Sequence, residues 1–196
     1  MTIYLLRHGE TVWNRDKRLQ GQKDTPLTQK GIIQAEAMGI ALKDQLFGRK
    51  PEVFLSSPLR RAHQTAVIVA DILNFGTEGI TIEDRLKEVT FGVWDGLNME
   101  EILESYETLW QQRRQSQWLF SPPEGESYVA AGARIQPLID NLSSSKILVI
   151  VAHGSLNRIF RGLWGKLEPE VFLTLNEPQD GFYRLETDGT ETFIQA

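Results

Sequence analysis

The chain of 196 residues contains no cysteine. Disulfide bonds, a thiolate nucleophile and cysteine-ligated zinc are therefore excluded. Long apolar runs are missing too: the longest strongly apolar stretch, residues 147–152, is far too short to cross a bilayer as a helix. The opening residues 1–4 lack the basic start and the apolar core of a signal peptide. We therefore expect a soluble, cytoplasmic protein that has no membrane partner.

An excess of positive charge is absent as well. Lysine and arginine together number 21 against 26 acidic residues, which gives a formal net charge of −5 at pH 7. This balance argues against nucleic acid as a partner, although it leaves room for a small local cluster of arginines. The length and the 41% hydrophobic composition suit one globular domain over residues 1–196 with a substantial core.

Two kinds of segment alternate along the chain. Short apolar runs rich in branched residues predict strands, and longer stretches with apolar residues on one helical face predict helices. The predicted strands are residues 3–6, 53–55, 80–82 and 147–152. One predicted helix follows an N-cap at Thr28, one has Pro58 in its first turn, two more span residues 99–114 and 128–142, and a hairpin is expected over residues 182–194. The alternation predicts an α/β fold, a three-layer sandwich whose mostly parallel central sheet has helices on both faces.

Two histidines occupy matching places at strand ends. Arg7 and His8 follow the first apolar run, His153 follows the last one, and each histidine precedes a glycine. Ligands of parallel α/β sheets bind at the carboxyl ends of the strands, and glycine lets a ligand approach the backbone closely. A helix expected to begin at Ser155 would offer free N–H groups to an anion. The pattern indicates an anion site; the alternative is that each histidine only ends its strand and bonds the backbone.

Several familiar site patterns are absent from the chain. There is no HxH or HExxH spacing for a metal, no Walker loop or GxGxxG for a nucleotide, and no GxSxG elbow for a serine nucleophile. We therefore expect no metal and no other cofactor.

Four longer segments carry a resemblance to a known family. They are LRHGET at residues 6–11 with Asn14 after it, SSPLRRAHQTA at 56–66, LKEVTFGVWDGL at 86–97 and AHG at 152–154. In this order they resemble the sequence blocks of the histidine phosphatase superfamily, which includes the cofactor-dependent phosphoglycerate mutases. The blocks span most of the chain, and the resemblance implies phosphoryl transfer through a phosphohistidine without a metal ion.

The resemblance assigns a role to each matching residue. It implies that His8 is the nucleophile, that Glu88 is the general acid, and that His153 is the second active-site histidine. Arg7 and Arg61 match the family's phosphate-clamping arginines, a role that suits arginine because its planar fork binds phosphate oxygens in pairs and stays charged. The further binding residues that the resemblance indicates are Asn14, Gln20, Gly21 and Gly154. The alternative for Glu88 is a structural ion pair with an arginine.

Some sequence features favour a phosphatase of this family, and one favours a mutase. Residues 18–21, 24–28 and 122–127 resemble the phosphatase branch, and Met99 stands where many mutases have lysine. The chain is also short for a mutase, which must shield its phosphohistidine from water. The pair at residues 113–114 resembles two arginines with which mutases hold a substrate carboxylate; the alternative is two solvated charges at a helix end.

We therefore predict a metal-independent phosphatase that hydrolyses a small phosphorylated metabolite. The metabolite is carboxylated if Arg113 and Arg114 face the site. One alternative is a cofactor-dependent phosphoglycerate mutase. Another, from a different class, is a non-catalytic relative that binds phosphorylated partners. An active enzyme is favoured because the nucleophile, both clamping arginines, the acid and the second histidine are all present.

Overall fold

The computed structural model describes residues 1–142 and 146–196. Its strands form one six-stranded sheet in the order β3-β2-β4-β1-β5-β6. Four strands pair in parallel: β1 (Thr2–Arg7), β2 (Val53–Ser56), β3 (Ile80–Ile82) and β4 (Ile147–Ala152). The strand β5 (Gly181–Glu186) pairs antiparallel with β1 and with β6 (Glu191–Gln195). The predicted mostly parallel sheet and C-terminal hairpin are confirmed, and the hairpin extends the sheet beyond β1.

The two central strands are buried on both faces, as their continuous apolar sequences predict. Successive side chains of residues 3–6 enter the two main hydrophobic clusters alternately, one cluster on each face of the sheet. β1 and β4 pair in a register that sets Arg7 beside Ala152. The next residues, His8 and His153, therefore leave neighbouring strands at the same edge of the sheet.

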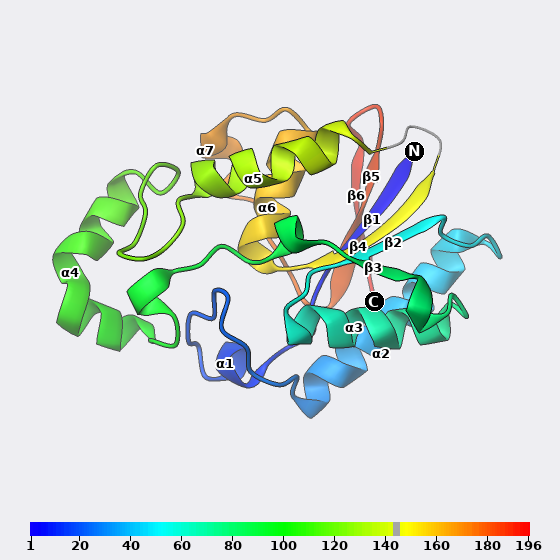
Figure 1. Cartoon of the computed structure of the whole chain (residues 1–196), viewed down its shortest axis with the longest axis horizontal. Helices are drawn as coiled ribbons and strands as arrows, with labels where there is room; N and C mark the ends of the chain where they lie inside the picture. The colour runs from blue at the N-terminus through cyan, green and yellow to red at the C-terminus, as the bar shows by residue number, and fades with distance from the viewer. Residues whose placement is uncertain (143–145) are drawn as a thin grey trace.

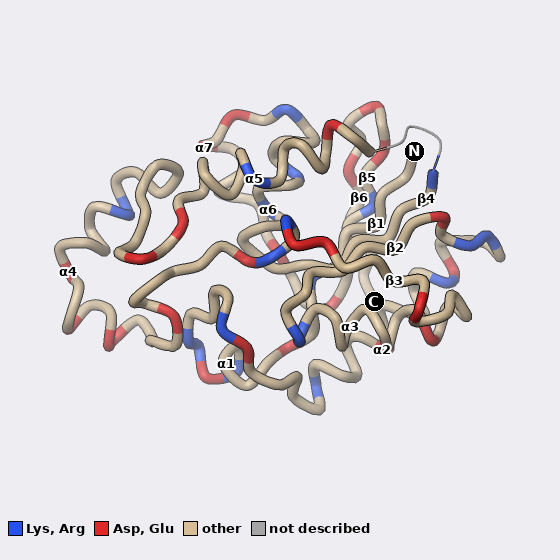
Figure 2. The backbone as a smooth tube through the Cα atoms, viewed as in Figure 1, with Lys and Arg blue, Asp and Glu red and all other residues tan. Residues whose placement is uncertain are grey.

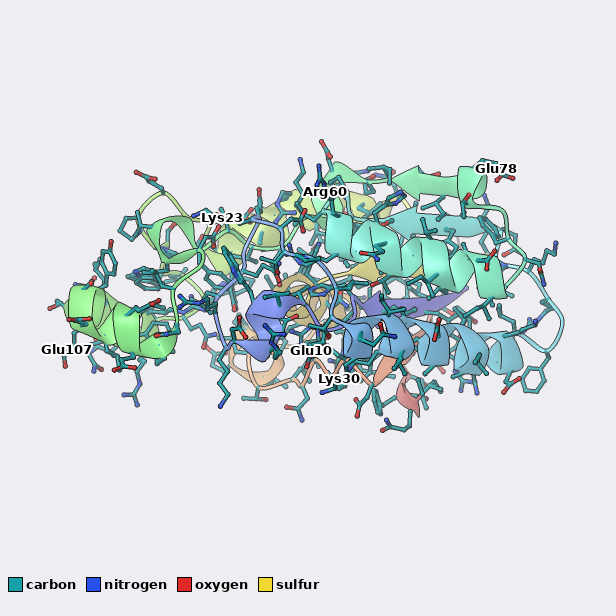
Figure 3. All side chains as sticks on the ribbon, turned by 90° about the horizontal axis from the view of Figure 1, so that it is seen from below. Glu10, Lys23, Lys30, Arg60, Glu78 and Glu107 are labelled. Atoms are coloured by element: carbon teal, nitrogen blue, oxygen red, sulfur yellow. The ribbon has the colours of Figure 1, made fainter. Side chains whose placement is uncertain are left out.

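Helices cover both faces of this sheet (Figure 1). On one face, α2 (Gln29–Leu46) and α3 (Arg60–Ile72) lie side by side (Figure 3). On the other face lie α5 (Tyr128–Asp140) and α6 (Gly154–Trp164), with the short α7 (Pro169–Phe172) against α6. A single turn, α1 (Val12–Arg15), follows β1, and 3₁₀ turns occupy residues 77–79, 84–86 and 92–94. The three-layer arrangement predicted from the sequence is confirmed.

The starts of α2 and α3 differ in how well the sequence predicts them. Thr28 is the N-cap of α2, and its side chain accepts a hydrogen bond from the backbone N–H of Gly31 at 3.0 Å. The expectation that Pro58 lies in the first turn of the next helix is wrong, because α3 begins at Arg60. The carboxylate of Asp24, remote in sequence, accepts the backbone N–H of Arg60 at 2.8 Å and so satisfies one of the free donors at this helix start.

The long helix α4 (Met99–Gln115) extends away from the sheet (Figure 1). It packs on a separate aromatic cluster built around Phe91, Trp94 and Ile102. Trp94 is fully buried there and stacks on Phe120 with ring centroids 5.8 Å apart. The α4 region therefore has a small core of its own beside the sheet.

Charged residues of both signs are interspersed along the loops and helices, and they are sparse on the central strands (Figure 2). In the described part of the chain, no helix combines the length and the apolar character that a membrane crossing requires. The cytoplasmic location expected from the sequence stays a prediction.

The loop after β1 lies directly against the first turn of α2. A Cβ atom on Gly31 would lie 2.1 Å from the carbonyl oxygen of Glu10, and one on Gly9 would lie 2.1 Å from the carbonyl oxygen of Gly31. Both neighbours are backbone atoms, so no side-chain rotation relieves the contact. The two glycines therefore let the backbone pack closely just after His8.

We expect Gly31→Ala to lower the free energy of unfolding by about 1–3 kcal/mol, because the added methyl group forces the backbone of this loop to move. Gly39→Ala, in the same helix, is the matched control. Its Cβ would meet the side chain of Ile72, which can shift, and the substitution gains helix propensity. Urea denaturation of both variants measures the difference; equal stabilities would contradict the backbone contact.

Candidate active site

A cavity of about 230 Å³ lies at the carboxyl ends of β1 and β4. Eight of the residues predicted for the site line it: Arg7, His8, Asn14, Gln20, Gly21, Arg61, Glu88 and Gly154. His153 lies beside His8, with their ring centroids 5.2 Å apart. The sequence blocks that are far apart along the chain are therefore neighbours around one cavity.

The His8 ring is buried and held by a hydrogen bond on each nitrogen. Its Nδ1 lies 2.7 Å from the carbonyl oxygen of Gly9, so Nδ1 carries the proton and donates. The Nε of Arg61 donates to Nε2 of His8 at 3.2 Å, which leaves Nε2 as the nitrogen with the lone pair. Burial, with Arg61 and Arg7 nearby, lowers the pKa of His8 well below its usual 6.5. The ring is therefore neutral at pH 7.

His153 is fully buried next to it. Its Nε2 lies 2.7 Å from the hydroxyl oxygen of Ser57. Its Nδ1 is buried and has no hydrogen-bond partner among the residues that the structure describes. Burial again lowers the pKa, and the charges of Arg61 and Arg7 act in the same direction.

Arg61 reaches the cavity from the first turn of α3 and is almost completely buried. Its Nη1 donates to the carbonyl oxygen of Lys23 at 2.8 Å and to the carboxylate of Asp24 at 2.9 Å, and its Nη2 donates to the carbonyl oxygen of Gly21 at 2.6 Å. Burial lowers the pKa of this guanidinium, while Glu88 and Asp24 oppose the shift. The loop of residues 21–24 therefore holds the two terminal nitrogens of the guanidinium, and the Nε–H donates to His8.

Arg7 is the last residue of β1 and directly precedes His8. Its Nη1 donates to the carbonyl oxygen of Glu177 at 2.5 Å, and its Nε is buried with no partner among the described residues. Burial lowers its pKa. Gly154 packs against this guanidinium, since a Cβ at Gly154 would lie 3.2 Å from the Cζ atom of Arg7. The site thus holds two cations, the buried Arg61 and the half-buried Arg7, and the buried Nε of Arg7 has its hydrogen-bonding capacity unused.

Asn14 has its side-chain amide oriented by two donors. Its Oδ1 accepts hydrogen bonds from the backbone N–H of Thr11 at 3.1 Å and from Nε2 of Gln179 at 3.0 Å. The Nδ2 group is left for the cavity that Asn14 lines. Gln179 also donates to the carbonyl oxygen of His8 at 3.1 Å. Gln179 was not predicted from the sequence, because it stands far along the chain in no recognisable motif.

Gln20 and Gly21 belong to the wall of the cavity. The Oε1 of Gln20 accepts from the hydroxyl of Thr11 at 2.8 Å, and its Nε2 donates to the hydroxyl of Thr25 at 3.0 Å. The carbonyl of Gly21 holds Arg61, as described above. These residues connect the segment after β1 to the loop that fixes Arg61.

Glu88 lies at the start of α6. Its carboxyl oxygens accept three backbone N–H groups: Oε1 accepts from Val89 at 2.9 Å and Leu156 at 3.0 Å, and Oε2 accepts from Ser155 at 3.1 Å. In the described ranges, no arginine or lysine nitrogen lies within 4 Å of it. The geometry therefore does not show the structural ion pair that was the alternative for Glu88.

The two arginines at the end of α4 have different environments. Arg113 is buried against the rings of Phe91, Trp110 and Tyr128, and its Nη2 donates to the Tyr128 hydroxyl at 3.2 Å. Arg114 is exposed. Neither residue belongs to the cavity lining. A role of this pair in holding a substrate stays a prediction.

Three charged residues of the lining were not predicted: Arg18, Arg158 and Glu177. Arg158 stands one helical turn after Gly154 on α6, a spacing that could have revealed it. Glu177 forms a buried ion pair with Arg161 at 2.5 Å. Burial raises the pKa of the Glu177 carboxyl to about 7, although Arg161 and Arg7 favour its ionised form. Within the described ranges, no three His, Asp or Glu side chains are grouped as a metal ion would require.

The neutral state of the buried histidines predicts a pH-dependent stability. Both rings bind protons in the unfolded chain below about pH 6.5 but not in the folded one, so unfolding takes up protons. Each histidine therefore makes the free energy of unfolding fall as the pH drops below about 6.5, by up to about 1.4 kcal/mol per pH unit.

Urea denaturation of the wild type and of His8→Gln, between about pH 7.5 and about pH 5.5, tests this expectation. Glu177 contributes in the opposite direction over part of this range, because the folded chain binds its proton more tightly than the unfolded one. That contribution is common to both proteins and cancels in the comparison. The wild type should lose stability more steeply on acidification; equal slopes would show that His8 is not held neutral.

Comparisons with known proteins agree with this arrangement. The family model of the histidine phosphatase superfamily (branch 1) matches residues 3–196. A relative named "Probable phosphoglycerate mutase GpmB", from Yersinia pestis (strain Pestoides F), is 33% identical over 159 residues, and the match covers 79% of this chain and 70% of that protein.

Two examples of solved structures share the fold. A mycobacterial glucosyl-3-phosphoglycerate phosphatase in complex with VO3 has a TM-score of 0.81 and 29% identity over 98% of this chain and 96% of that one. An alpha-ribazole phosphatase from Shigella flexneri has a TM-score of 0.87 and 24% identity over 100% and 96% of the two chains. The chain therefore belongs to the histidine phosphatase superfamily.

Proposed function

We propose that the chain is a phosphatase that hydrolyses small phosphomonoesters through a phosphohistidine on His8. The observation that carries this proposal is the state of the His8 ring. Its Nδ1 is bound to the Gly9 carbonyl, and the lone pair on Nε2 is directed to Arg61 at the cavity wall. Attack on a phosphoryl group requires a neutral imidazole whose attacking nitrogen carries a lone pair.

The surroundings of His8 suit a phosphoryl group. A phosphate ester carries about −1.5 to −2 charges at neutral pH and offers several acceptor oxygens. Arg7 Nε is a buried donor without a protein acceptor among the described residues, and Asn14 lines the cavity with its Oδ1 already accepting two hydrogen bonds. When the ester binds, the Nε–H of Arg61 would donate its hydrogen bond to a phosphoryl oxygen in place of Nε2 of His8. The lone pair of Nε2 would then be free to attack. A bound phosphoryl group would thus satisfy the cations that the empty site leaves partly unpaired.

The reaction proceeds in two displacements. In the first, Nε2 of His8 attacks phosphorus, the bond from phosphorus to the ester oxygen breaks, and the leaving oxygen takes a proton from Glu88. In the second, water attacks the phosphohistidine, the phosphorus–nitrogen bond breaks, and Glu88 takes a proton from that water. The products are an alcohol and inorganic phosphate, and His8 and Glu88 return to their starting states.

Glu88 is placed to exchange that proton through Oε2. This oxygen accepts one backbone N–H, whereas Oε1 accepts two. The second lone pair of Oε2 is therefore available for a proton shared with the leaving oxygen. The bound monoester or the solvent would supply the first proton.

The position of α4 favours hydrolysis over a mutase reaction. No residue of α4 belongs to the lining of the cavity, and the helix packs on its own aromatic cluster instead. A mutase must keep water from its phosphohistidine while the acceptor binds. A site that α4 does not cover would let water act as the acceptor.

We expect His8→Ala to abolish phosphate release and phosphoenzyme formation, because no other lone pair replaces Nε2. The measurement is phosphorus NMR of 3-phosphoglycerate with protein, EDTA and a trace of 2,3-bisphosphoglycerate. Growth of inorganic phosphate without 2-phosphoglycerate supports the phosphatase, and other esters follow if this one is not cleaved. His63→Ala, a histidine outside the cavity, is the matched control. Activity that needs added magnesium after EDTA, or phosphohistidine that survives in His8→Ala, would contradict the proposal.

The second candidate function is that of a phosphoglycerate mutase. The environment of the Arg113 guanidinium is the observation that favours it. This buried guanidinium has no carboxylate within 4 Å among the described residues, and Tyr128 connects it to Ser155 at the cavity wall through hydrogen bonds of 3.2 Å. A small movement of α4 would bring it toward a substrate carboxylate. The relative named as a mutase points to the same chemistry.

If Arg113 and Arg114 hold a carboxylate, replacing both with glutamine should raise KM for 3-phosphoglycerate about 10-fold or more and spare glycerol 3-phosphate, which has no carboxylate. In this case the phosphorus spectrum should also show rapid exchange between the two phosphoglycerates in the wild type. An equal loss on both esters would mean that the pair supports the fold of α4 and does not contact the substrate.

A further inference from the structure

The arginines that line the cavity differ in their partners. Arg61 is paired with Asp24 at 2.9 Å, and Arg18 is paired with Glu101 at 2.7 Å. Arg7 ends β1 beside His8 and donates to a carbonyl. Arg158 is the remaining arginine of the described lining, and no carboxylate oxygen lies within 4 Å of its guanidinium. The cavity therefore contains a cation that the proposed chemistry does not use.

The guanidinium of Arg158 is held in place from one side. Its Nε donates to the carbonyl oxygen of Leu175 at 2.8 Å, and no protein acceptor for its two terminal nitrogens is found in the described part of the chain. The residue is half-buried on α6, one turn after Gly154. One edge of the planar group is fixed, and its terminal N–H groups remain available to an anion.

Arg158 reaches the cavity from a point on α6 one turn beyond the residue that contacts Arg7. Gly154 touches the Arg7 guanidinium, and the backbone of Arg158 lies about 6 Å farther along the helix axis. In the proposed reaction the phosphoryl group lies at His8, so the alcohol part of the ester extends away from it. Arg7 and Arg61 already lie beside His8, so in the proposed complex the terminal nitrogens of Arg158 remain for the alcohol part of the ester.

We propose that Arg158 binds a carboxylate on the alcohol part of the substrate. This inference rests on the proposed phosphatase function and narrows its substrates to carboxylated phosphomonoesters. One carboxylate fits the charges better than a second phosphate does. Glu88 and Glu177 already line the cavity, and Asp24 and Glu101 already neutralise two of its arginines. A planar guanidinium also matches a carboxylate in pairs of hydrogen bonds.

This assignment differs from the one that the sequence indicated. The sequence left open whether Arg113 and Arg114 hold a substrate carboxylate or are solvated charges at a helix end, and α4 places neither of them in the cavity lining. Arg158 belongs to the lining and comes from the same helix start that holds Glu88. The carboxylate subsite is therefore on α6, beside the proposed general acid.

The test compares matched esters with and without the carboxylate. In Arg158→Gln, KM for 3-phosphoglycerate should rise about 10- to 100-fold, because a charge-assisted pair is lost, and KM for glycerol 3-phosphate should change less than about 2-fold. The kcat values should remain near those of the wild type. Equal changes on the two esters, or a wild type that does not prefer 3-phosphoglycerate over glycerol 3-phosphate, would overturn the proposal.

A second variant separates binding from a structural effect of the Leu175 contact. Arg158→Lys keeps a cation but loses the planar fork, so it should retain part of the preference for the carboxylated ester. If Arg158 serves only to hold residue 175, the two variants should lose activity on both esters alike. Arg60→Gln is the matched control, because Arg60 is exposed at the start of α3 and outside this cavity (Figure 3).

A binding measurement keeps this inference distinct from the proposed function. Calorimetry with phosphonoacetate and methylphosphonate needs no turnover, and the two probes differ by the carboxylate. Wild-type protein should prefer phosphonoacetate about 10-fold or more, and Arg158→Gln should lose that preference. If the preference is present but no ester is hydrolysed, the phosphatase proposal fails and the subsite stands. A preference that persists in Arg158→Gln would refute the subsite, whatever the activity.

Discussion

Positive charge buried beside a neutral histidine is the constraint on which the rest of the site depends. Arg61 is buried and Arg7 is half-buried with its Nε enclosed, and both lie next to His8. Removing guanidinium groups from water is costly unless other groups compensate. The compensation comes mainly from backbone carbonyls, which the loops of residues 21–24 and 175–179 turn toward the two cations. An anion would supply the rest. The conformation of these loops is therefore tied to the charge at the centre of the cavity, and not only to packing.

The same electrostatics explains why His8 and Glu88 can have opposite tasks within one small cavity. Burial and the two cations hold His8 neutral, with its proton on the Gly9 side, so the proposed nucleophile needs no separate base. Glu88 is placed differently, against backbone N–H groups at the start of α6, where a helix favours negative charge. Substrate binding changes the charge near both groups at once. The proposed proton transfer at Glu88 is therefore coupled to the arrival of the phosphoryl group.

The fold and the centre of the site could be predicted from the sequence because their signals are local. A strand buried on both faces has a continuous apolar run, and a residue at its carboxyl end must lie at the edge of the sheet, as His8 and His153 do. The segments that resemble the family then indicated which other residues, among them Arg61 and Glu88, would lie around the same cavity. The start of α3 was misplaced because the donor group of Arg60 is satisfied by Asp24 from another segment, which no local pattern reports.

The outer wall of the cavity could not be predicted, because its position depends on the whole sheet. The hairpin of β5 and β6 pairs with β1, and this pairing brings the 175–179 segment against a strand that begins the chain. Gln179 then orients Asn14, and the carbonyl of residue 175 fixes Arg158. Gln179, Leu175 and Arg158 all lie outside the blocks that carry the family resemblance. The proposed chemistry thus depends on the strand ends, whereas the shape around the alcohol depends on residues that can change without altering the nucleophile. This separation is consistent with a family in which similar folds have been named as phosphatases and as a mutase.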